Sequence, residues 1–513
     1  MKALFGRTGA ILALTTLILA GCGGSSGGDG GVSPPPPPPP PPTGGITRTG
    51  VGVAVGPITG FGSVIVNGVR YETNAATEFT RDDNPSAQDA FKVGETVIVK
   101  GTIDDNNANA VAESVELDEI VKGPATSLVD LNTAIVMGQT VNSTATTSID
   151  DNCGAVTFDD LTGLTGFFAV EVYGTVQASG AIDATRIECK QPGEVTEFEV
   201  NGIVSGNVPG STFMINALQV NYSATPLIQN FPNGAPEDGQ PVEVKGAPGD
   251  FSIGSAGQPD VLAASKVEFK GNRLDGNEGD HFEIEGFISA FRSISDFDVR
   301  VGSTTFTVAT DPASTTFEGD QNLLDVNVKV EVEGDLDGDL NIFATKVEIK
   351  TSTNIRVTGV VDPIVNGEIR ILNIRINTND GETRFEDKRD DDPNFDAGSV
   401  MAGDFVEARG QEIPTGEITA FVFERDDLDP DTELRGFVED GSVSGRNSFV
   451  ILGVTVDTSN VQPDDYSDGN NNPITADAFW SAVGTGGVIV DAKGVEEADG
   501  TTLTARELEL EME

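Results

Sequence analysis

The sequence is poor in the residues that most enzyme and metal sites require. Its 513 residues include one histidine, His281, one tryptophan and three cysteines. Ser-His-Asp or Cys-His catalysis needs an imidazole held by an acid beside a nucleophile, and one histidine after an Asn/Gly-rich link is typical of a solvated residue. One histidine and the two cysteines of the chain's interior also lack the local ligand spacing of a zinc site. We therefore expect no enzymatic activity.

Basic residues are also few. The 31 lysines and arginines stand against 82 aspartates and glutamates, which gives a formal net charge of -51. So negative a surface repels phosphate groups, which excludes nucleic acid as a partner and excludes binding to anionic lipid headgroups through side chains. Low aromatic content and 61 glycines favour short strands joined by turns, and the length requires several domains. The expected fold class is all-β.

The amino terminus has the pattern of a lipoprotein signal. Residues 1–21 place Lys2 and Arg7 before an apolar run that is too short to span a membrane comfortably. The junction Leu19-Ala20-Gly21-Cys22 resembles the lipobox of bacterial lipoproteins, which implies removal of residues 1–21 and lipidation of Cys22. The alternative is an ordinary secreted protein in which Cys22 is incidental. Because Gly23 follows the cysteine, lipoprotein sorting rules imply the outer membrane, facing the periplasm or the cell surface, with the lipid anchor as the contact to the membrane.

Residues 22–50 are expected to form a disordered, lipidated tether. A Gly/Ser run leads into nine consecutive prolines, residues 34–42. Polyproline extends by about 3.1 Å per residue, so this run would hold the folded part roughly 28 Å from the membrane. Polyproline also binds aromatic grooves, but directly after a lipid anchor we favour a spacer.

A Val-rich strand that ends in glycine recurs six times along the rest of the chain, at intervals of 72 to 88 residues. A second strand, which begins with alanine, follows each glycine. The distance is short except in the third copy, where a longer Pro- and Gly-rich loop lies between the two strands. A fixed spacing of this kind indicates tandem domains. The glycines are Gly101, Gly174, Gly246, Gly334, Gly410 and Gly494, and the alanines are Ala112, Ala184, Ala264, Ala344, Ala420 and Ala505.

The clearest copy of this hairpin spans residues 330–350. Val330 and Val332 alternate with Glu331 and Glu333, so we expect one face in a core and one charged face in water. Each copy has about five strands in roughly 70 to 85 residues, which is too small for an immunoglobulin sandwich and fits a small OB-like barrel. Short links predict that barrels adjacent in sequence touch. The six repeats are assigned to residues 51–121, 122–193, 194–271, 280–351, 352–427 and 431–513.

The repeated pattern of an h-x-G-x-h strand, V-x-V-x-G, a short turn and A-x-x-V-x-h, where h is apolar, resembles the tandem modules of the domain of unknown function 5666 family. The resemblance runs from about Gly56 to the end of the chain and is best in the fourth copy. It implies an OB-like small barrel in a bacterial envelope lipoprotein. It implies no activity and no catalytic residues.

Cys153 and Cys189 both lie in the second repeat. The compartment beyond the inner membrane is oxidising, so a disulfide across this 36-residue interval is favoured, and it would stabilise the repeat by roughly 2 to 4 kcal/mol. The alternative is two separate buried thiols.

Acidic residues cluster in several loops, including Arg81-Asp82-Asp83-Asn84. Calcium takes six to eight oxygens from such groups, although ordinary turn chemistry explains the same residues. The candidate calcium ligands are Asp426, Asp427, Asp429 and Asp431, at the junction of the fifth and sixth repeats.

The preferred hypothesis is a non-enzymatic envelope lipoprotein without a required cofactor. Its barrels would form a spacer or interaction scaffold at the outer membrane, with an envelope protein or polysaccharide as partner. The alternative is a surface module that binds calcium or polysaccharide, the latter around Trp480.

Overall fold

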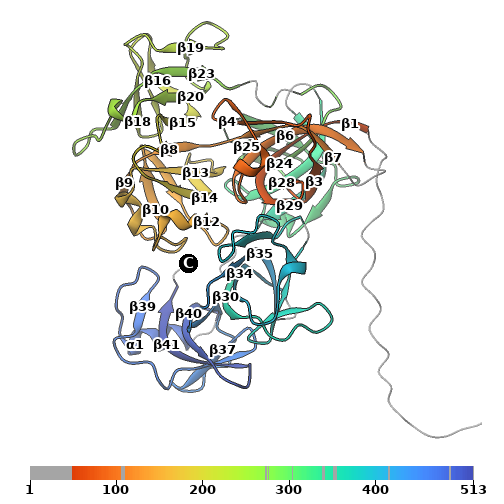
Figure 1. Cartoon of the computed structure of the whole chain (residues 1–513), viewed down its shortest axis with the longest axis vertical. Coiled ribbons are helices and arrows are strands. Elements are labelled where there is room, and N and C mark those ends of the chain that lie inside the picture. The colour runs from red at the N-terminus through yellow and green to blue at the C-terminus, as the bar shows by residue number, and fades with distance from the viewer. Residues whose placement is uncertain are drawn as a thin grey trace, which may run out of the picture. The chain divides into compact units, whose positions relative to one another are not determined.

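The regular structure is almost entirely β, as predicted (Figure 1). The computed structural model describes residues 49–511, apart from 105–109, 272–273, 275, 303, 338–340, 351–354, 380, 414–415 and 485–486. The predicted signal peptide, Cys22 and the tether up to residue 48 lie outside the described residues. Within them, no helix has the length and apolar character needed to cross a membrane.

Repeat 4 shows the barrel most simply. Its first strand, β24 (His281–Ser293), pairs antiparallel with β25 (Asp296–Val301) and with β28 (Lys329–Leu336). Strand β25 pairs antiparallel with β26 (Thr304–Ala309), and β28 pairs antiparallel with β29 (Asn341–Lys350). A parallel pairing of β26 with β29 closes the ring. This connectivity is that of a five-stranded OB-type barrel and confirms the predicted fold.

The other five repeats have the same order of strands, with local interruptions. Pro124 separates β8 from β9, and Val204 separates β15 from β16. Repeat 3 also divides its last strand and adds β21 (Phe251–Ser252) in the long loop that the sequence shows there. The ring strands are β1 (Thr49–Gly60), β2 (Val64–Val66), β3 (Val69–Glu72), β6 (Thr96–Asp104) and β7 (Ala110–Leu117) in repeat 1; β8 (Val121–Gly123), β9 (Ala125–Leu128), β10 (Thr133–Val136), β11 (Gln139–Asn142), β13 (Ala169–Val176) and β14 (Ile182–Lys190) in repeat 2; β15 (Phe198–Ile203), β16 (Ser205–Val208), β17 (Thr212–Ile215), β18 (Leu218–Asn221), β20 (Pro241–Gly246), β22 (Asp260–Ala263) and β23 (Lys266–Phe269) in repeat 3; β30 (Ile355–Val360), β31 (Ile369–Ile371), β32 (Ile374–Asn377), β34 (Phe405–Ile413) and β35 (Glu417–Asp426) in repeat 5; and β36 (Thr432–Phe437), β37 (Ser448–Ile451), β38 (Val454–Asp457), β40 (Ile489–Glu496) and β41 (Thr502–Leu510) in repeat 6.

Each repeat also has a short strand that the sequence did not reveal. It lies before the Val-rich strand and pairs parallel with the last strand of its barrel. Two to four residues are too few to show a period in the sequence. These strands are β4 (Glu78–Arg81), β12 (Ser148–Ile149), β19 (Leu227–Gln229), β27 (Thr316–Glu318), β33 (Arg384–Asp387) and β39 (Tyr466–Asp468). Two further elements belong to single repeats, β5 (Asn84–Ser86) in repeat 1 and α1 (Ala476–Val483) in repeat 6.

The repeated glycine and alanine meet at a β-bulge. In repeat 4, Gly334 lies opposite Ala344 and Glu333 lies opposite Lys346, so Thr345 is the extra residue. A Cβ atom on Gly334 would lie 2.3 Å from the carbonyl oxygen of Phe343. Only glycine fits there, which explains the motif. The same close approach, 2.0 to 2.2 Å, occurs at Gly101, Gly174, Gly410 and Gly494.

A threonine hydroxyl supports the bulge in four repeats. The Thr315 hydroxyl donates a hydrogen bond to the Ala344 carbonyl at 2.7 Å and accepts one from the Asp311 backbone N–H at 2.9 Å. The arrangement satisfies a buried carbonyl of the disturbed ladder. Equivalent pairs of bonds are made by Thr77, Thr147 and Thr383 in repeats 1, 2 and 5.

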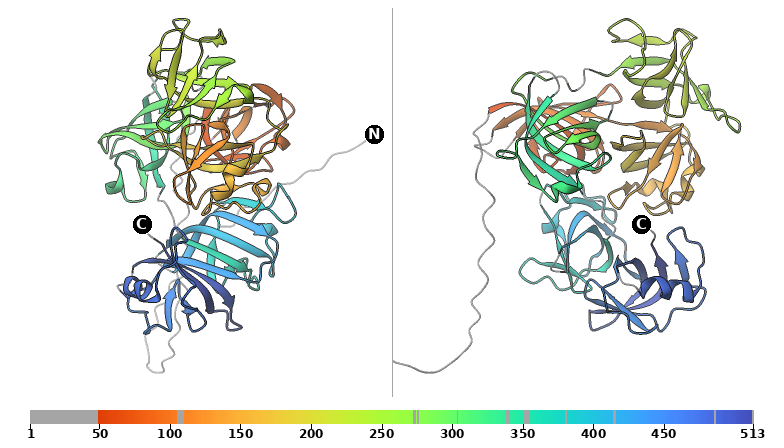
Figure 2. Two further views of the ribbon diagram at one scale, coloured as in Figure 1. Left: turned by 90° about the vertical axis from the view of Figure 1, so that its left-hand side faces the viewer. Right: turned by 180° about the vertical axis from the view of Figure 1, so that it is seen from behind.

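First strands also pair with first strands of other repeats. Strand β1 pairs parallel with β24, from Gly52 opposite His281 to Val55 opposite Ile284. Strands β8 and β15 pair antiparallel, and so do β30 and β36. The repeats are therefore joined as 1 with 4, 2 with 3, and 5 with 6; in Figure 2 the red first repeat lies beside the green fourth repeat. The pairing of repeats 1 and 4 was not expected from short links between neighbours.

Candidate functional site

Many glutamates of the charged strand faces are buried, which corrects the prediction that these faces lie in water, although the Glu333 side chain does reach solvent. Five glutamates of these faces, on strands β13, β15, β20, β28 and β35, are at most 6% exposed. Carboxylates at such depth require cationic partners. In repeat 4, for example, Lys350 Nζ lies 3.0 Å from a Glu331 carboxylate oxygen. The five residues are Glu171, Glu199, Glu243, Glu331 and Glu424.

The turn between β4 and β5 of repeat 1 reaches lysines of repeats 2 and 3. Asp82 and Asp83 both have positive φ, of 50° and 61°, which turns their carboxylates toward these lysines. Lys122 Nζ donates to Asp82 Oδ1 at 3.1 Å. Asp83 Oδ2 accepts from Lys245 at 3.0 Å and from Lys266 at 2.8 Å. Burial alone would raise the pKa of the Asp83 carboxyl, but these lysines outweigh burial and lower that pKa well below its usual range.

Arginines of repeat 5 hold repeat 2. Arg409 donates to the Thr147 carbonyl at 2.7 Å, and its guanidinium lies over the Phe158 ring. Arg356 donates to Asp159 at 2.8 Å. Guanidinium groups suit these contacts because they combine several donors with a flat, weakly hydrated face. The contacts join barrels that are not paired through their strands.

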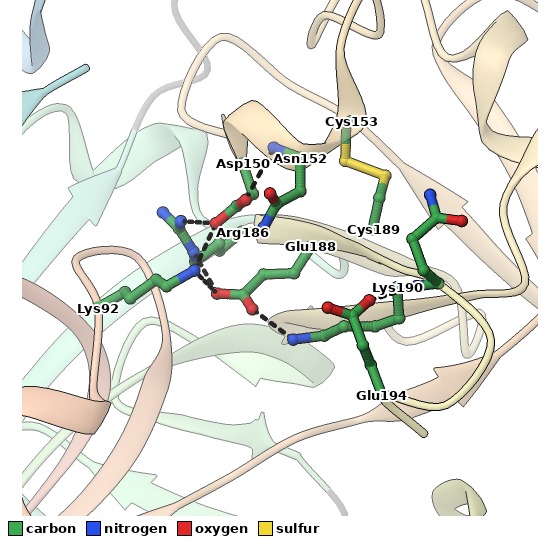
Figure 3. The surroundings of a disulfide bond; sticks show 10 residues. Lys92, Asp150, Asn152, Cys153, Arg186, Glu188, Cys189, Lys190 and Glu194 are labelled. Carbon is green, nitrogen blue, oxygen red and sulfur yellow. Dashed lines mark hydrogen bonds and ion pairs between the residues drawn. A yellow bond between two sulfur atoms is a disulfide. The ribbon is translucent and has the colours of Figure 1, made fainter. Parts of the chain in front are cut away.

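A disulfide joins Cys153 and Cys189, with an S–S distance of 2.01 Å (Figure 3). It fastens the turn that begins at Asp150 to strand β14. Arg186 Nη2, on β14, donates to Asp150 at 2.7 Å, and Lys92 Nζ of repeat 1 donates to the same carboxylate oxygen at 2.5 Å. Figure 3 shows both cations converging on Asp150. The disulfide thus supports the residues through which repeat 2 binds repeat 1.

A cavity of about 830 Å³ lies among the described residues. Repeats 1, 2, 4 and 5 line it, with Arg435 of repeat 6. Its wall combines amides, hydroxyls and phenyl rings with nine charged residues. A volume of this size accommodates a small organic ligand. Lining residues that offer such groups include Asn67, Asn132, Phe158, Gln177, Phe287 and Asn327. We call this hollow the central cavity.

Arg384 is the unusual charge of the central cavity. It is buried, and its guanidinium donates to the backbone carbonyls of Thr185, at 2.9 Å, and Thr146. No described carboxylate forms an ion pair with it. Burial, followed by the charge of Arg409, lowers the pKa of Arg384 to about 10. Asp183, on the same wall, is held by amides of Asn142 and Gln177, and burial raises the pKa of its carboxyl.

The four predicted calcium ligands do not form a ligand group in the structure. The Asp426 and Asp429 carboxylates accept backbone N–H groups of their own segment, at 2.7 and 2.8 Å. Asp431 instead forms a hydrogen bond with Arg506 at 2.7 Å. Among the described residues, carboxylates gather closely enough for a metal in two other places, Asp82 with Glu119 and Glu199, and Asp83 with Glu243 and Glu268.

Trp480 and His281, which the sequence analysis considered as site residues, both contact residues of their own repeats. Trp480 is 7% exposed on α1 and packs edge-on against Phe449 and Phe479, so it offers no surface on which a sugar would stack. This corrects the saccharide site predicted around it. His281 Nδ1 lies 3.1 Å from Asp335 Oδ1 at the start of β24.

Comparison with known protein families agrees with the repeat. A family model described as a domain of unknown function (DUF5666) matches residues 55–116, 122–188, 285–348 and 358–421. The chain belongs to this family. The matched DUF5666 segments are repeats 1, 2, 4 and 5, the four in which a threonine supports the bulge. No curated protein matches the chain.

Proposed function

We propose that the chain is a non-enzymatic envelope lipoprotein whose six barrels form a rigid interaction scaffold. Lipids on Cys22 would anchor it in the outer membrane, and the polyproline tether would hold it away from the surface. The observation that carries the proposal is the pairing of first strands between repeats. Backbone hydrogen bonds between barrels restrict their relative motion far more than flexible links would.

Ion pairs between repeats support the same function. They lie at junctions of repeats 1 with 2 and 3, and of repeats 2 with 5, and each pairs a buried cation with a partly exposed carboxylate. Removal of the carboxylate leaves the buried cation uncompensated. Such contacts favour one arrangement of the barrels. A scaffold needs this property because it presents partner surfaces at fixed distances.

Membrane fractionation tests the anchor. The full chain with its signal is expressed in a Gram-negative host, and membrane and soluble fractions are compared for the native sequence and Cys22→Ser. We expect the native chain in the membrane fraction and the variant in the soluble fraction, while Cys153→Ser, a control of the same chemistry, stays in the membrane. Hydrolysis of a polymer by the purified chain, lost on a single substitution, would contradict the scaffold.

The central cavity favours a second function, the binding of a short envelope saccharide. Amide side chains both donate and accept hydrogen bonds, as sugar hydroxyls require, and the phenyl rings supply apolar contact. Titration calorimetry with neutral and uronic acid oligosaccharides tests it. Binding that is lost in Gln177→Ala and kept in Glu113→Ala, a substitution on the exposed surface, would support this function. The absence of binding heat with both classes of sugar would contradict it.

A further inference from the structure

Three carboxylates from different parts of the chain meet beside the β4–β5 turn. Asp82 belongs to that turn, Glu119 to the end of repeat 1 after β7, and Glu199 to β15 of repeat 3. Each offers one oxygen, and the three oxygens lie within 4.8 Å of one another. A hollow of about 20 Å³ lies among them, with Asn201 on its wall. Its size is that of one water molecule or one ion.

Glu119 has an unsatisfied oxygen at this hollow. The residue is 4% exposed. Its Oε2 accepts from Lys122 Nζ at 3.0 Å, whereas Oε1 has no hydrogen-bond partner among the described residues. A buried carboxylate oxygen without a partner destabilises the folded state, because it has lost its hydrogen bonds to water. Its position therefore indicates a ligand that is not part of the chain.

Two lysines hold the three carboxylates, and Lys270 also lies on the wall of the hollow. Lys122 bridges Asp82 and Glu119, and Lys245 Nζ lies 3.2 Å from Glu199 Oε2. Lys245 is shared with Asp83, at 3.0 Å, so it does not compensate Glu199 alone. Lys122 and Lys245 are thus the lysines paired with these three carboxylates, whereas Asp83 is also bound by Lys266 and Lys270.

The neighbouring carboxylate group provides a contrast. Glu243 Oε1 lies 3.0 Å from Lys266 and its Oε2 lies 2.9 Å from Lys270. Glu268 and Asp83 are bound by the same two lysines. Lysines already occupy both oxygens of Glu243, whereas Glu119 Oε1 has neither a hydrogen bond nor an ion pair among the described contacts.

We propose that Asp82, Glu119 and Glu199 bind a calcium ion that fastens repeat 1 to repeat 3. Calcium is the divalent cation whose preference for several oxygens and flexible geometry suits one oxygen from each carboxylate, completed by the Asn201 amide oxygen and water. The lysines hold the remaining oxygens and orient the ligands. The Asp82 side chain is 38% exposed, which gives the ion a route from solvent.

Thermal unfolding of the purified mature chain tests the site. Melting temperatures are measured in a chelator, in 5 mM calcium chloride and in 5 mM magnesium chloride at equal ionic strength. We expect calcium to raise the melting temperature by about 2 °C or more and magnesium to raise it less. Coincident curves in calcium and chelator, or an equal shift with magnesium, would overturn the proposal.

Variants locate the ion. Glu119→Gln keeps the shape of the side chain and removes the charge, so it should abolish the calcium shift and one equivalent of bound calcium in equilibrium dialysis. Asp82→Asn serves in its place if Glu119→Gln does not fold. Asp427→Asn, in the segment first predicted to bind calcium, is the matched control. It should retain the calcium shift of the melting temperature and the bound calcium. Retention of the shift in Glu119→Gln, or its loss in Asp427→Asn, would refute this location.

Discussion

The guanidinium carbon of Arg409 in repeat 5 lies 4.4 Å from the centre of the Phe158 ring in repeat 2. The same side chain is 1% exposed and donates to Glu424 at 2.5 Å and to the Thr147 carbonyl at 2.7 Å. One cation thus satisfies a carboxylate of its own barrel and a carbonyl and a ring of another. Both repeats depend on it.

Replacement of Arg409 by methionine should therefore be strongly destabilising. Methionine fills much of the volume but leaves the Thr147 carbonyl and part of the Glu424 charge unsatisfied. We expect a loss of about 3 kcal/mol in the free energy of unfolding, measured by urea denaturation. The control is Arg446→Met, because Arg446 pairs with Asp477 where both side chains are more than half exposed, and its loss should be below about 1 kcal/mol. Equal losses in the two variants would refute the argument.

Gly334→Ala should destabilise repeat 4, because the new Cβ would lie 2.3 Å from the Phe343 carbonyl oxygen and the bulge would have to open. We expect a loss of about 2 kcal/mol or more by urea denaturation. Gly166→Ala is the control, since its Cβ would meet nothing within 4 Å and its φ is not positive. That variant should be neutral or slightly stabilised. A neutral Gly334→Ala would show that the bulge is not the reason for the glycine.

Reduction of the Cys153–Cys189 disulfide should lower the stability of the native chain by about 2 to 4 kcal/mol, because the unfolded chain regains freedom over 36 residues. Unfolding is followed in urea with and without a reductant. The double variant Cys153→Ser/Cys189→Ser should resemble the reduced native chain and ignore the reductant. A reductant effect that persists in this variant would place its origin elsewhere.

Glu331 should make stability depend on pH. Burial raises the pKa of its carboxyl to about 7, although Lys350 opposes the shift. The folded state then binds more protons than the unfolded state between about pH 4.5 and 7, so this group makes the free energy of unfolding fall as pH rises through that window. Glu331→Gln removes the effect. We expect the free energy of unfolding of the variant, relative to that of the native chain, to rise by roughly 2 kcal/mol from pH 5 to pH 8, as measured by urea denaturation.

The control for this pH dependence is Glu113→Gln, an exposed position on β7. Its free energy of unfolding is measured over the same pH range and serves as the baseline for Glu331→Gln. A flat difference for Glu331→Gln over the same range would mean that Glu331 remains ionised in the folded state throughout.

The barrel itself was predictable from local pattern. Alternation around Val330 and Val332 identified the strands, and the recurring glycine and alanine located the hairpin in every copy. The bulge that explains those two residues is visible only in the pairing, since sequence does not show which carbonyl a Cβ would meet. Strand β27 was missed because three residues carry no period.

The interfaces were not predictable in the same way. Alternation shows that Glu331 and Val332 point to opposite sides, but not whether water or another barrel covers the charged side. The Asp82-Asp83 turn was recognised as acidic, whereas its lysines lie in other repeats. One signal was available: Lys245, Lys266 and Lys270 gather in one repeat of a chain that has few basic residues. The sequence left open whether Cys153 and Cys189 form a disulfide or two separate buried thiols, and in the structure they form a disulfide.

The pairing of β1 with β24 constrains how such a chain can be synthesised and how it can evolve. Domains generally fold in order from the amino terminus, so residues 52–55 emerge more than two hundred residues before their partners and expose an unpaired edge meanwhile. In a simple string of modules, copies can be gained or lost without harm. Here deletion of repeat 2 or 3 would shorten the connection that brings repeat 4 back to repeat 1. The copy number of this array is therefore set by its architecture, and selection on length alone cannot vary it freely.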